Sequence, residues 1–209
     1  MYQNLLFDWS GTLVNDLPPT LFATNAVLAH YDVAEMDLDE FRARFRLPYP
    51  EFYEEVLPGV AIDSLEDIFR SAFRASPEQV TVLPHAREMM EWCREQGTRC
   101  FILSSMDTGV FDEQAARLGM DHFFERLYTG IIDKRERIGS ILDAHDLDPS
   151  VTAFIGDMAH DIETAHYGGV ASVAVTTGYD PEARLVKAEP THLFPHLTAF
   201  REWLEEQGN

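Results

Sequence analysis

The chain has 209 residues, of which 36 are acidic and 16 basic, so its formal net charge is -20. This charge argues against binding to nucleic acid or to an anionic membrane, because both need a basic protein surface. The length is sufficient for one large domain or for a core domain with a smaller insertion.

No charged start followed by an apolar stretch precedes the first predicted strand, and no apolar run approaches about 18 residues. We therefore expect neither a secretion signal nor a membrane-spanning helix. The two cysteines, Cys93 and Cys100, lack the spacing of metal ligands and are predicted to be reduced core residues. These features favour a cytoplasmic protein.

The first predicted element lies within residues 4–14, which read NLLFDWSGTLV. The apolar run Leu5-Leu6-Phe7 predicts a buried parallel strand, at whose end Asp8 faces a cleft before a Gly-Thr turn. An aspartate can also end a strand by binding its own turn. This segment alone therefore leaves a functional and a structural role for Asp8 open.

A block of helices follows, in which apolar residues recur at three- and four-residue spacing and no strand pattern intervenes. Asp37 and Asp63 are predicted N-caps, and Pro50 suits a first helical turn. Such a block between strands indicates an inserted helical cap, with joints near residues 14–19 and 77–84. We predict a core domain of residues 1–16 and 80–209 and a cap of residues 17–79. The predicted cap helices span residues 17–31, 37–45, 49–57 and 63–76.

After Pro84 the sequence alternates between helix and strand patterns. Repeated strand–helix–strand units predict an α/β fold, namely a doubly wound, Rossmann-like parallel sheet with helices on both faces. Ligands of such sheets bind at the carboxyl ends of the strands. The predicted strands cover residues 99–103, 126–128, 151–157 and 171–178, and the helices 85–97, 107–118, 135–145, 160–169 and 197–206.

Polar residues stand at the ends of four predicted strands. Carboxylates brought together in a cleft repel one another, so the site needs a compensating cation. Lys134 and a metal ion are the candidates, and a small set of oxygen ligands favours Mg²⁺. The strand ends carry Asp8, Ser104, Asp133-Lys134, and Asp157 followed three residues later by His160-Asp161.

These segments occur in an order that resembles the haloacid dehalogenase (HAD) superfamily of phosphohydrolases. DWSGTLV is similar to the first family motif, FILSS to the second, Lys134 to the third and GDMAHD to the fourth. With a helical C1-type cap after the first strand, the chain resembles the phosphoglycolate phosphatase and β-phosphoglucomutase branch. The resemblance implies a Mg²⁺-dependent phosphatase that acts on a small phosphorylated metabolite.

Carried over by position, the resemblance makes Asp8 the nucleophile that attacks phosphorus and forms an aspartyl-phosphate. Asp161 would orient Lys134 or a metal-bound water. Phosphoryl transfer needs mainly positioning and charge neutralisation around an in-line attack, which this set could supply. The other implied roles are phosphate binding by Ser104, Ser105 and Lys134, and Mg²⁺ binding by Asp8, Asp157 and the backbone carbonyl of Ser10.

Ser10 departs from the family pattern, because phosphatases of the family carry a second Asp there as general acid and base. A serine hydroxyl is no base at neutral pH, so assistance worth about 10²- to 10⁴-fold in rate is lost or comes from elsewhere. The alternatives are a hydrolase of C–P bonds, as in the phosphonoacetaldehyde hydrolases, or a weakly catalytic phospho-ligand-binding or regulatory protein. The phosphonoacetaldehyde hydrolases use a cap lysine, whereas the predicted cap here has none.

Several other polar and aromatic residues receive structural interpretations. Trp9 is expected to pack in the core, and Asp16 and His85, at the predicted joints, are expected to be helix caps or hinge contacts. The sequence names neither the substrate nor the oligomeric state. Residues expected on solvated or packing faces are Arg42, Arg44, Arg46, Tyr49, Tyr53, His160 and His166.

Overall fold

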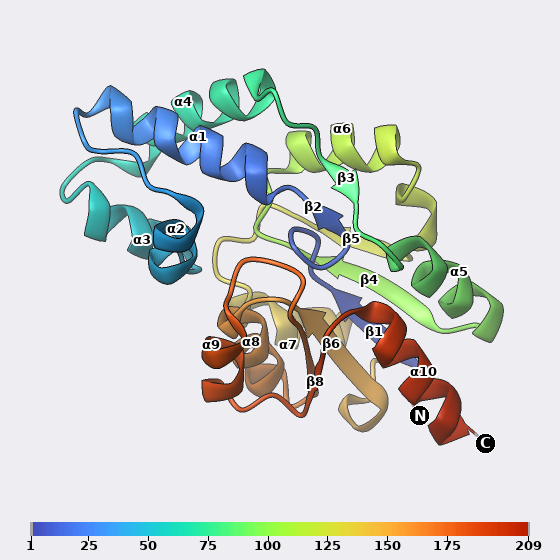
Figure 1. The fold of residues 1–209 in the computed structure, drawn as a ribbon. Helices are drawn as coiled ribbons and strands as arrows, with labels where there is room; N and C mark the ends of the chain where they lie inside the picture. Colours follow the sequence, from blue (N-terminus) through green and yellow to red (C-terminus); the bar gives the residue numbers. More distant parts are fainter. Residues whose placement is uncertain (1, 209) are drawn as a thin grey trace.

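The computed structural model describes residues 2–208, and its centre is a six-stranded sheet in the order β5-β4-β1-β6-β7-β8 (Figure 1). Every neighbouring pair in this sheet is parallel. The predicted α/β, Rossmann-like fold is confirmed. The strands are β1 (Asn4–Phe7), β4 (Arg99–Leu103), β5 (Arg126–Tyr128), β6 (Thr152–Gly156), β7 (Ala171–Val175) and β8 (His192–Phe194).

Helices cover both faces of the sheet, as parallel strands require. One face packs against α5 (Ala86–Gln96), α6 (Thr108–Leu118) and α10 (Leu197–Gly208). The other packs against α7 (Arg135–Ala144) and α8 (Ala159–Gly168), with α9 (Glu182–Lys187) beside α8. Within residues 2–208, no helix combines the length and apolar character needed to cross a membrane.

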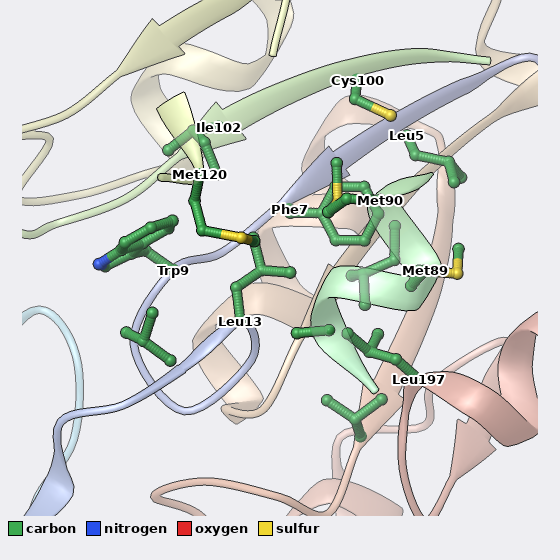
Figure 2. Close-up of a cluster of buried hydrophobic side chains, with 14 of the residues drawn as sticks. Leu5, Phe7, Trp9, Leu13, Met89, Met90, Cys100, Ile102, Met120 and Leu197 are labelled. Carbon is green, nitrogen blue, oxygen red and sulfur yellow. The ribbon is translucent and has the colours of Figure 1, made fainter. Parts of the chain in front are cut away.

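Strand β1 lies in the middle of the sheet, and its side chains alternate between the two helical layers. Leu5 and Phe7 belong to the core on the α5 side, whereas Leu6 belongs to the core on the α7 side. Figure 2 shows Leu5 and Phe7 among Met89, Met90 and other side chains of the first core. Because both faces are buried, Leu5, Leu6 and Phe7 are apolar, and the buried Asn4 at the start of β1 is paired with Thr152 at 3.0 Å. Asp8 follows directly after this strand.

Four of the five helices between β1 and β4 form a separate group at one end of the molecule, and we call these four the cap helices (Figure 1). Their apolar side chains make a cluster of their own, which the core residues Met158 and Tyr179 join. The helical insertion is therefore present, although its predicted limits at residues 17 and 79 stay a prediction. The cap helices are α1 (Leu17–His30), α2 (Leu38–Arg44), α3 (Tyr49–Val56) and α4 (Ile62–Ala75).

The two joints of the insertion pair with each other, which the sequence analysis did not anticipate. Strand β2 (Val14–Asn15) runs antiparallel to β3 (Thr81–Val82), with Val14 opposite Val82. Each strand has two residues, too few for a pattern of alternation to show.

Some local predictions need correction. The side chain of Asp37 caps α2 by accepting from the Glu40 N–H at 2.8 Å, as predicted. Asp63 is not an N-cap, because α4 begins one residue earlier and Ala61 occupies that position. The short elements β8 and α9 were also not predicted. Two 3₁₀ turns, η1 (Asp121–Phe123) and η2 (Pro149–Val151), complete the chain.

Candidate active site

The structure brings together the polar residues that follow four neighbouring strands. Asp8 follows β1, Asp157 follows β6, Ser104 follows β4, and Lys134 precedes α7 in the segment after β5. Because β5, β4, β1 and β6 are adjacent and parallel, their carboxyl ends meet at one edge of the sheet. All four side chains are buried there.

Lys134 lies between two carboxylates. Its Nζ is 2.8 Å from Asp8 Oδ1 and 2.7 Å from Asp161 Oδ1, and the lysine is fully buried. Burial opposes the charge of Lys134, but Asp161 and Asp8 outweigh it and raise the lysine's pKa. Burial raises the pKa of Asp8 to about 6, although Lys134 opposes that shift. The predicted proximity of Asp161 to Lys134 is present.

Asp157 is held by donors from two distant segments. Its Oδ1 accepts from Thr12 Oγ1 at 2.8 Å, and its Oδ2 accepts from the Tyr179 N–H at 2.8 Å. Two glycines make room for the carboxylate: a Cβ on Gly11 would lie 2.4 Å from Asp157 Oδ2, and one on Gly178 would lie 2.0 Å from it. Burial, followed by the charge of Asp8, raises the pKa of Asp157 well above its usual range.

The acidic groups of this edge fit a hard cation. Asp8, Asp157 and Asp161 are buried, and one oxygen from each lies within 4.8 Å of the others. Among the described residues, Asp8 Oδ1 makes its 2.8 Å ion pair with the Lys134 ammonium and no further hydrogen bond. Three carboxylates facing one lysine leave excess negative charge, and oxygen ligands of this kind suit Mg²⁺. Asp8 and Asp157 would hold the ion.

Ser104 and Ser105 follow β4 and line a cavity that Asp8 and Lys134 also line. The Ser104 hydroxyl accepts from the Met106 N–H at 3.3 Å. The Ser105 hydroxyl is buried and has no hydrogen-bond partner among the described residues. A buried hydroxyl normally finds a partner, so the unpaired Ser105 hydroxyl, on a residue that lines the cavity, is a candidate to bind an oxygen of a ligand.

Asp16 joins this site, and of its two predicted roles, helix cap or hinge contact, the cap is wrong. It stands before α1 at the N-cap position, but its side chain makes no capping hydrogen bond. Its Oδ2 instead accepts from the Ser10 hydroxyl at 2.6 Å, and its Oδ1 accepts from the Tyr179 hydroxyl at 2.9 Å. Burial raises the pKa of Asp16 to about 6, although both hydrogen bonds oppose the shift. A carboxylate therefore contacts Ser10 after all.

A cavity of about 270 Å³ connects these groups to the cap helices. Of the sequence-predicted site residues, Asp8, Ser10, Ser104, Ser105 and Lys134 line it. Asp157 and Asp161 lie behind them and do not line the cavity wall. The sequence analysis did not assign several other cavity-lining residues to the site. They come from the joint before α1, from the cap helices and from the loop after β7, and they include Asp16, Thr20, Glu66, Phe69, Arg70 and Tyr179.

The residues given structural interpretations fall into two groups. Trp9 is buried, packs on Phe111 and donates its indole N–H to Gln114 Oε1 at 2.9 Å, so its packing role is confirmed. Arg44 and Arg46 pair with Glu55 in the partly exposed surface of the cap. Tyr49 and Tyr53 differ from expectation because they line the cavity. His85 occupies the predicted N-cap position of α5, although its side chain makes no capping hydrogen bond.

His160 is buried behind Lys134. Its Nε2 accepts from the Lys134 backbone N–H at 3.3 Å, and its Nδ1 has no partner among the described residues. Burial, helped by the Lys134 charge, lowers the pKa of His160 to about 3. The sequence analysis expected His160 on a solvated or on a packing face. The structure shows a buried, neutral packing residue.

The parallel α/β fold and the site at the ends of its strands define the class of protein. The family model of haloacid dehalogenase-like hydrolases matches residues 5–175, and the chain belongs to that family. The predicted family and the assignment as a hydrolase are confirmed.

Individual relatives agree with this family. The chain is 28% identical over 213 residues to a 5'-nucleotidase of Pseudomonas aeruginosa, covering 98% of this chain and 96% of that protein. It is 23% identical to a phosphoglycolate phosphatase of Pseudomonas syringae pv. tomato, over 92% of this chain and 76% of that one. A haloacid dehalogenase-like hydrolase of Streptococcus pneumoniae superposes with a TM-score of 0.82 at 21% identity, over 97% and 98% of the two chains. This last likeness concerns the fold.

Proposed function

We propose that the chain is a Mg²⁺-dependent phosphatase that hydrolyses a small phosphate monoester through an aspartyl-phosphate on Asp8. The observation that supports this most is the buried ion pair between Asp8 and Lys134 at one end of a cavity, with Asp157 and Asp161 beside it. Relatives named phosphoglycolate phosphatase and 5'-nucleotidase are consistent with a phosphate ester as substrate. The substrate would be a cytoplasmic metabolite.

In this proposal the protein's own groups act in two steps. A carboxylate oxygen of Asp8 attacks phosphorus while the bond to the alcohol oxygen breaks, and that oxygen leaves with a proton from the Asp16 carboxyl, which regains a proton from the water of the second step. Lys134 neutralises Asp8 and the phosphoryl oxygens, and Ser104 and Ser105 hold those oxygens. Water then cleaves the aspartyl-phosphate to release inorganic phosphate and regenerate Asp8.

A bound Mg²⁺ would reduce the repulsion between Asp8 and the anionic phosphate. Asp8, Asp157 and the Ser10 carbonyl are the proposed ligands, and Asp161 would keep Lys134 in place, supported by its 2.7 Å contact with Nζ. A calorimetric titration with Mg²⁺ tests this ligand set. We expect Asp157→Ala to lose the binding that the wild type shows, and equal binding by both proteins would rule out Asp157 as a ligand.

The function itself is tested by release of phosphate from p-nitrophenyl phosphate and a sugar phosphate, with and without Mg²⁺. We expect Asp8→Asn to abolish turnover, because it keeps the shape of the side chain but removes the nucleophilic charge. Asp63→Asn makes the same change at an exposed position of α4 and should leave the rate unchanged. An active Asp8→Asn protein would refute the aspartyl-phosphate route.

Assays of phosphonate cleavage and of phosphate binding, added to the ester assays, separate two other functions. Cleavage of phosphonates in place of phosphate esters would identify a C–P bond hydrolase, but Lys134 and Lys187 are the sole lysines and neither lies in the cap. Binding of phosphate without turnover of any ester would identify a phospho-ligand-binding protein. The buried, unpaired Ser105 hydroxyl is compatible with either outcome.

A further inference from the structure

The cavity above Asp8 has two ends of different chemistry. One end holds the carboxylates and Lys134 described above. The other end is walled by aliphatic and aromatic side chains from the cap helices and from the loops that face them. Its apolar lining includes Phe45, Leu47, Leu65, Phe69, Phe73 and Met106.

The charges at this second end are already paired. Among the described residues that line the cavity, Arg70 is the one basic side chain apart from Lys134. Its guanidinium lies 2.9 Å from Asp67, 3.4 Å from Asp107 and 3.6 Å from Glu66. Three carboxylates around one guanidinium leave this corner negative, so it offers no free cation to a second anionic group.

Glu66 is held in place on the cavity wall. Its Oε1 accepts from the Tyr49 hydroxyl at 2.6 Å, while Oε2 faces Arg70. A ligand carboxylate placed here would be repelled by Glu66 and Asp107 and would find the guanidinium of Arg70 already paired. Burying an unpaired carboxylate is far more costly than burying an apolar group, which is favourable.

The size of the cavity limits the ligand further. A cavity of about 150 Å³ can hold a benzene molecule. The volume here is about 270 Å³, which has room for a phosphate group and one ring-sized substituent. A two- or three-atom substituent would leave the apolar walls uncovered.

We propose that the cavity takes a phosphate monoester whose alcohol part is uncharged, mainly apolar and about the size of one ring. The phosphate end of this inference rests on the function proposed above, and the apolar end adds the class of leaving group. Glycolate, a small anionic alcohol, does not match these walls. This chain is therefore expected to differ in substrate from those relatives that are named phosphoglycolate phosphatase.

Binding of non-hydrolysable phosphonates tests the inference without requiring turnover. Benzylphosphonate, ethylphosphonate and phosphonoacetate are titrated into the Mg²⁺-loaded wild type by calorimetry. We expect benzylphosphonate to bind at least about 10-fold more tightly than ethylphosphonate, and phosphonoacetate to bind weakest. Phosphonoacetate binding as tightly as benzylphosphonate, or no binding by any of the three, would overturn the proposal. Because only binding is measured, an inactive enzyme that still prefers benzylphosphonate would refute the hydrolysis and not this inference.

Two sets of variants locate the preference. Phe69→Ala should weaken the binding of benzylphosphonate about 10-fold and that of ethylphosphonate less than about 2-fold. Phe69→Leu is the milder substitution to use if Phe69→Ala impairs folding. Glu66→Gln removes one charged partner of Arg70 and should strengthen the binding of phosphonoacetate several-fold. The control Asp63→Asn, at an exposed position of the same helix, should leave the binding of phosphonoacetate and of benzylphosphonate unchanged. Equal effects of Phe69→Ala on both apolar ligands, or no gain for phosphonoacetate in Glu66→Gln, would overturn the assignment of these walls.

Discussion

The hydroxyl of Ser10 donates a 2.6 Å hydrogen bond to Asp16, whose carboxylate is buried on the same cavity wall as Asp8. The second Asp16 oxygen accepts from Tyr179 at 2.9 Å, which fixes the carboxylate's orientation. The family resemblance places a carboxylate at position 10, and this chain has a serine there. A carboxylate nevertheless lies one hydrogen bond away from that position, and it comes from the joint before α1.

The first prediction concerns Asp16→Asn, which keeps the size of the side chain and an oxygen to accept the Ser10 hydroxyl. Asn cannot give or take a proton, so hydrolysis of an alkyl phosphate should fall by about 10²-fold or more. An aryl phosphate has a good leaving group and should be much less affected. The check is kcat/KM for a sugar phosphate and for p-nitrophenyl phosphate in both proteins, because this ratio reports the transfer to Asp8 and not the hydrolysis of the aspartyl-phosphate that both substrates share. Equal losses on the two substrates would show that Asp16 positions Ser10 and moves no proton.

A second prediction concerns Ser10→Asp, which from the sequence alone looks like the restoration of a missing acid. In the structure it would place a partly buried carboxylate on the cavity wall against the buried Asp16, where like charges repel. We expect the single variant to lose about 2–4 kcal/mol of unfolding free energy. The double variant Ser10→Asp/Asp16→Asn should recover most of that loss and should hydrolyse an alkyl phosphate faster than Ser10→Asp alone. Urea unfolding measures the stability, and a Ser10→Asp protein as stable as the wild type would contradict the repulsion.

Gly178 provides a third prediction, because its missing side chain leaves room for Asp157. A Cβ there would lie 2.0 Å from Asp157 Oδ2 and 2.8 Å from the Gly11 Cα, and both neighbours are held in place. Gly178→Ala should therefore cost about 1–3 kcal/mol and weaken Mg²⁺ binding at least about 10-fold. Gly139→Ala is the matched control, since no atom lies within 4 Å of its Cβ position inside α7. That control should gain up to about 1 kcal/mol, and Mg²⁺ binding unchanged in Gly178→Ala would refute the argument.

The fourth prediction is a pH dependence of stability that arises from His160. Its pKa is about 3 in the folded protein and 6.5 as the ordinary value, so the unfolded chain binds more protons between these limits. The stabilisation that neutral His160 contributes is fully present above about pH 6.5. As the pH falls from there toward 3, the free energy of unfolding decreases by about 1.4 kcal/mol per pH unit. The charged groups around it are Lys134, Asp133, Arg135 and Asp8.

Other site groups titrate in the same range with the opposite sign. Burial raises the pKa values of Asp8 and Asp16 to about 6, so their contribution to stability grows as the pH falls below 6. The His160 effect is therefore read as a difference between wild type and His160→Gln, which should widen in favour of the variant between pH 6.5 and 5. His166→Gln on the exposed face of α8 is the control and should run parallel to wild type. A constant difference between wild type and His160→Gln would contradict the prediction.

The sequence predicted those parts of the site that lie where strands end. Asp8, Ser104 and Asp157 each follow an apolar strand, and parallel strands necessarily bring such residues to one edge. Asp16 and Tyr179 were missed, because their roles depend on a contact between residues 163 positions apart in the chain. Asp16 also stands directly before a helix, where its local sequence favours a cap.

The core was more predictable than the cavity for a related reason. Leu5, Leu6 and Phe7 are apolar whichever helix covers them, so periodicity alone identifies their burial. Arg70 and Glu66 have no such signal, because the pairing of a guanidinium depends on which surface α4 faces. Short elements such as β2, β3 and β8 have too few residues to show a period.

The antiparallel contact between Val14 and Val82 makes the polypeptide leave and re-enter the core at one place. A short turn joining these two positions would leave the order and direction of all six sheet strands unchanged. Apart from Asp16 and the few side chains that pack against the sheet core, such as Ala23 and Phe73, the intervening stretch can therefore vary in length and sequence. Chemistry and selectivity can then evolve on separate pieces of one gene, because a new insert alters what enters the cavity while Asp8, Lys134 and Asp157 keep their strand-end positions.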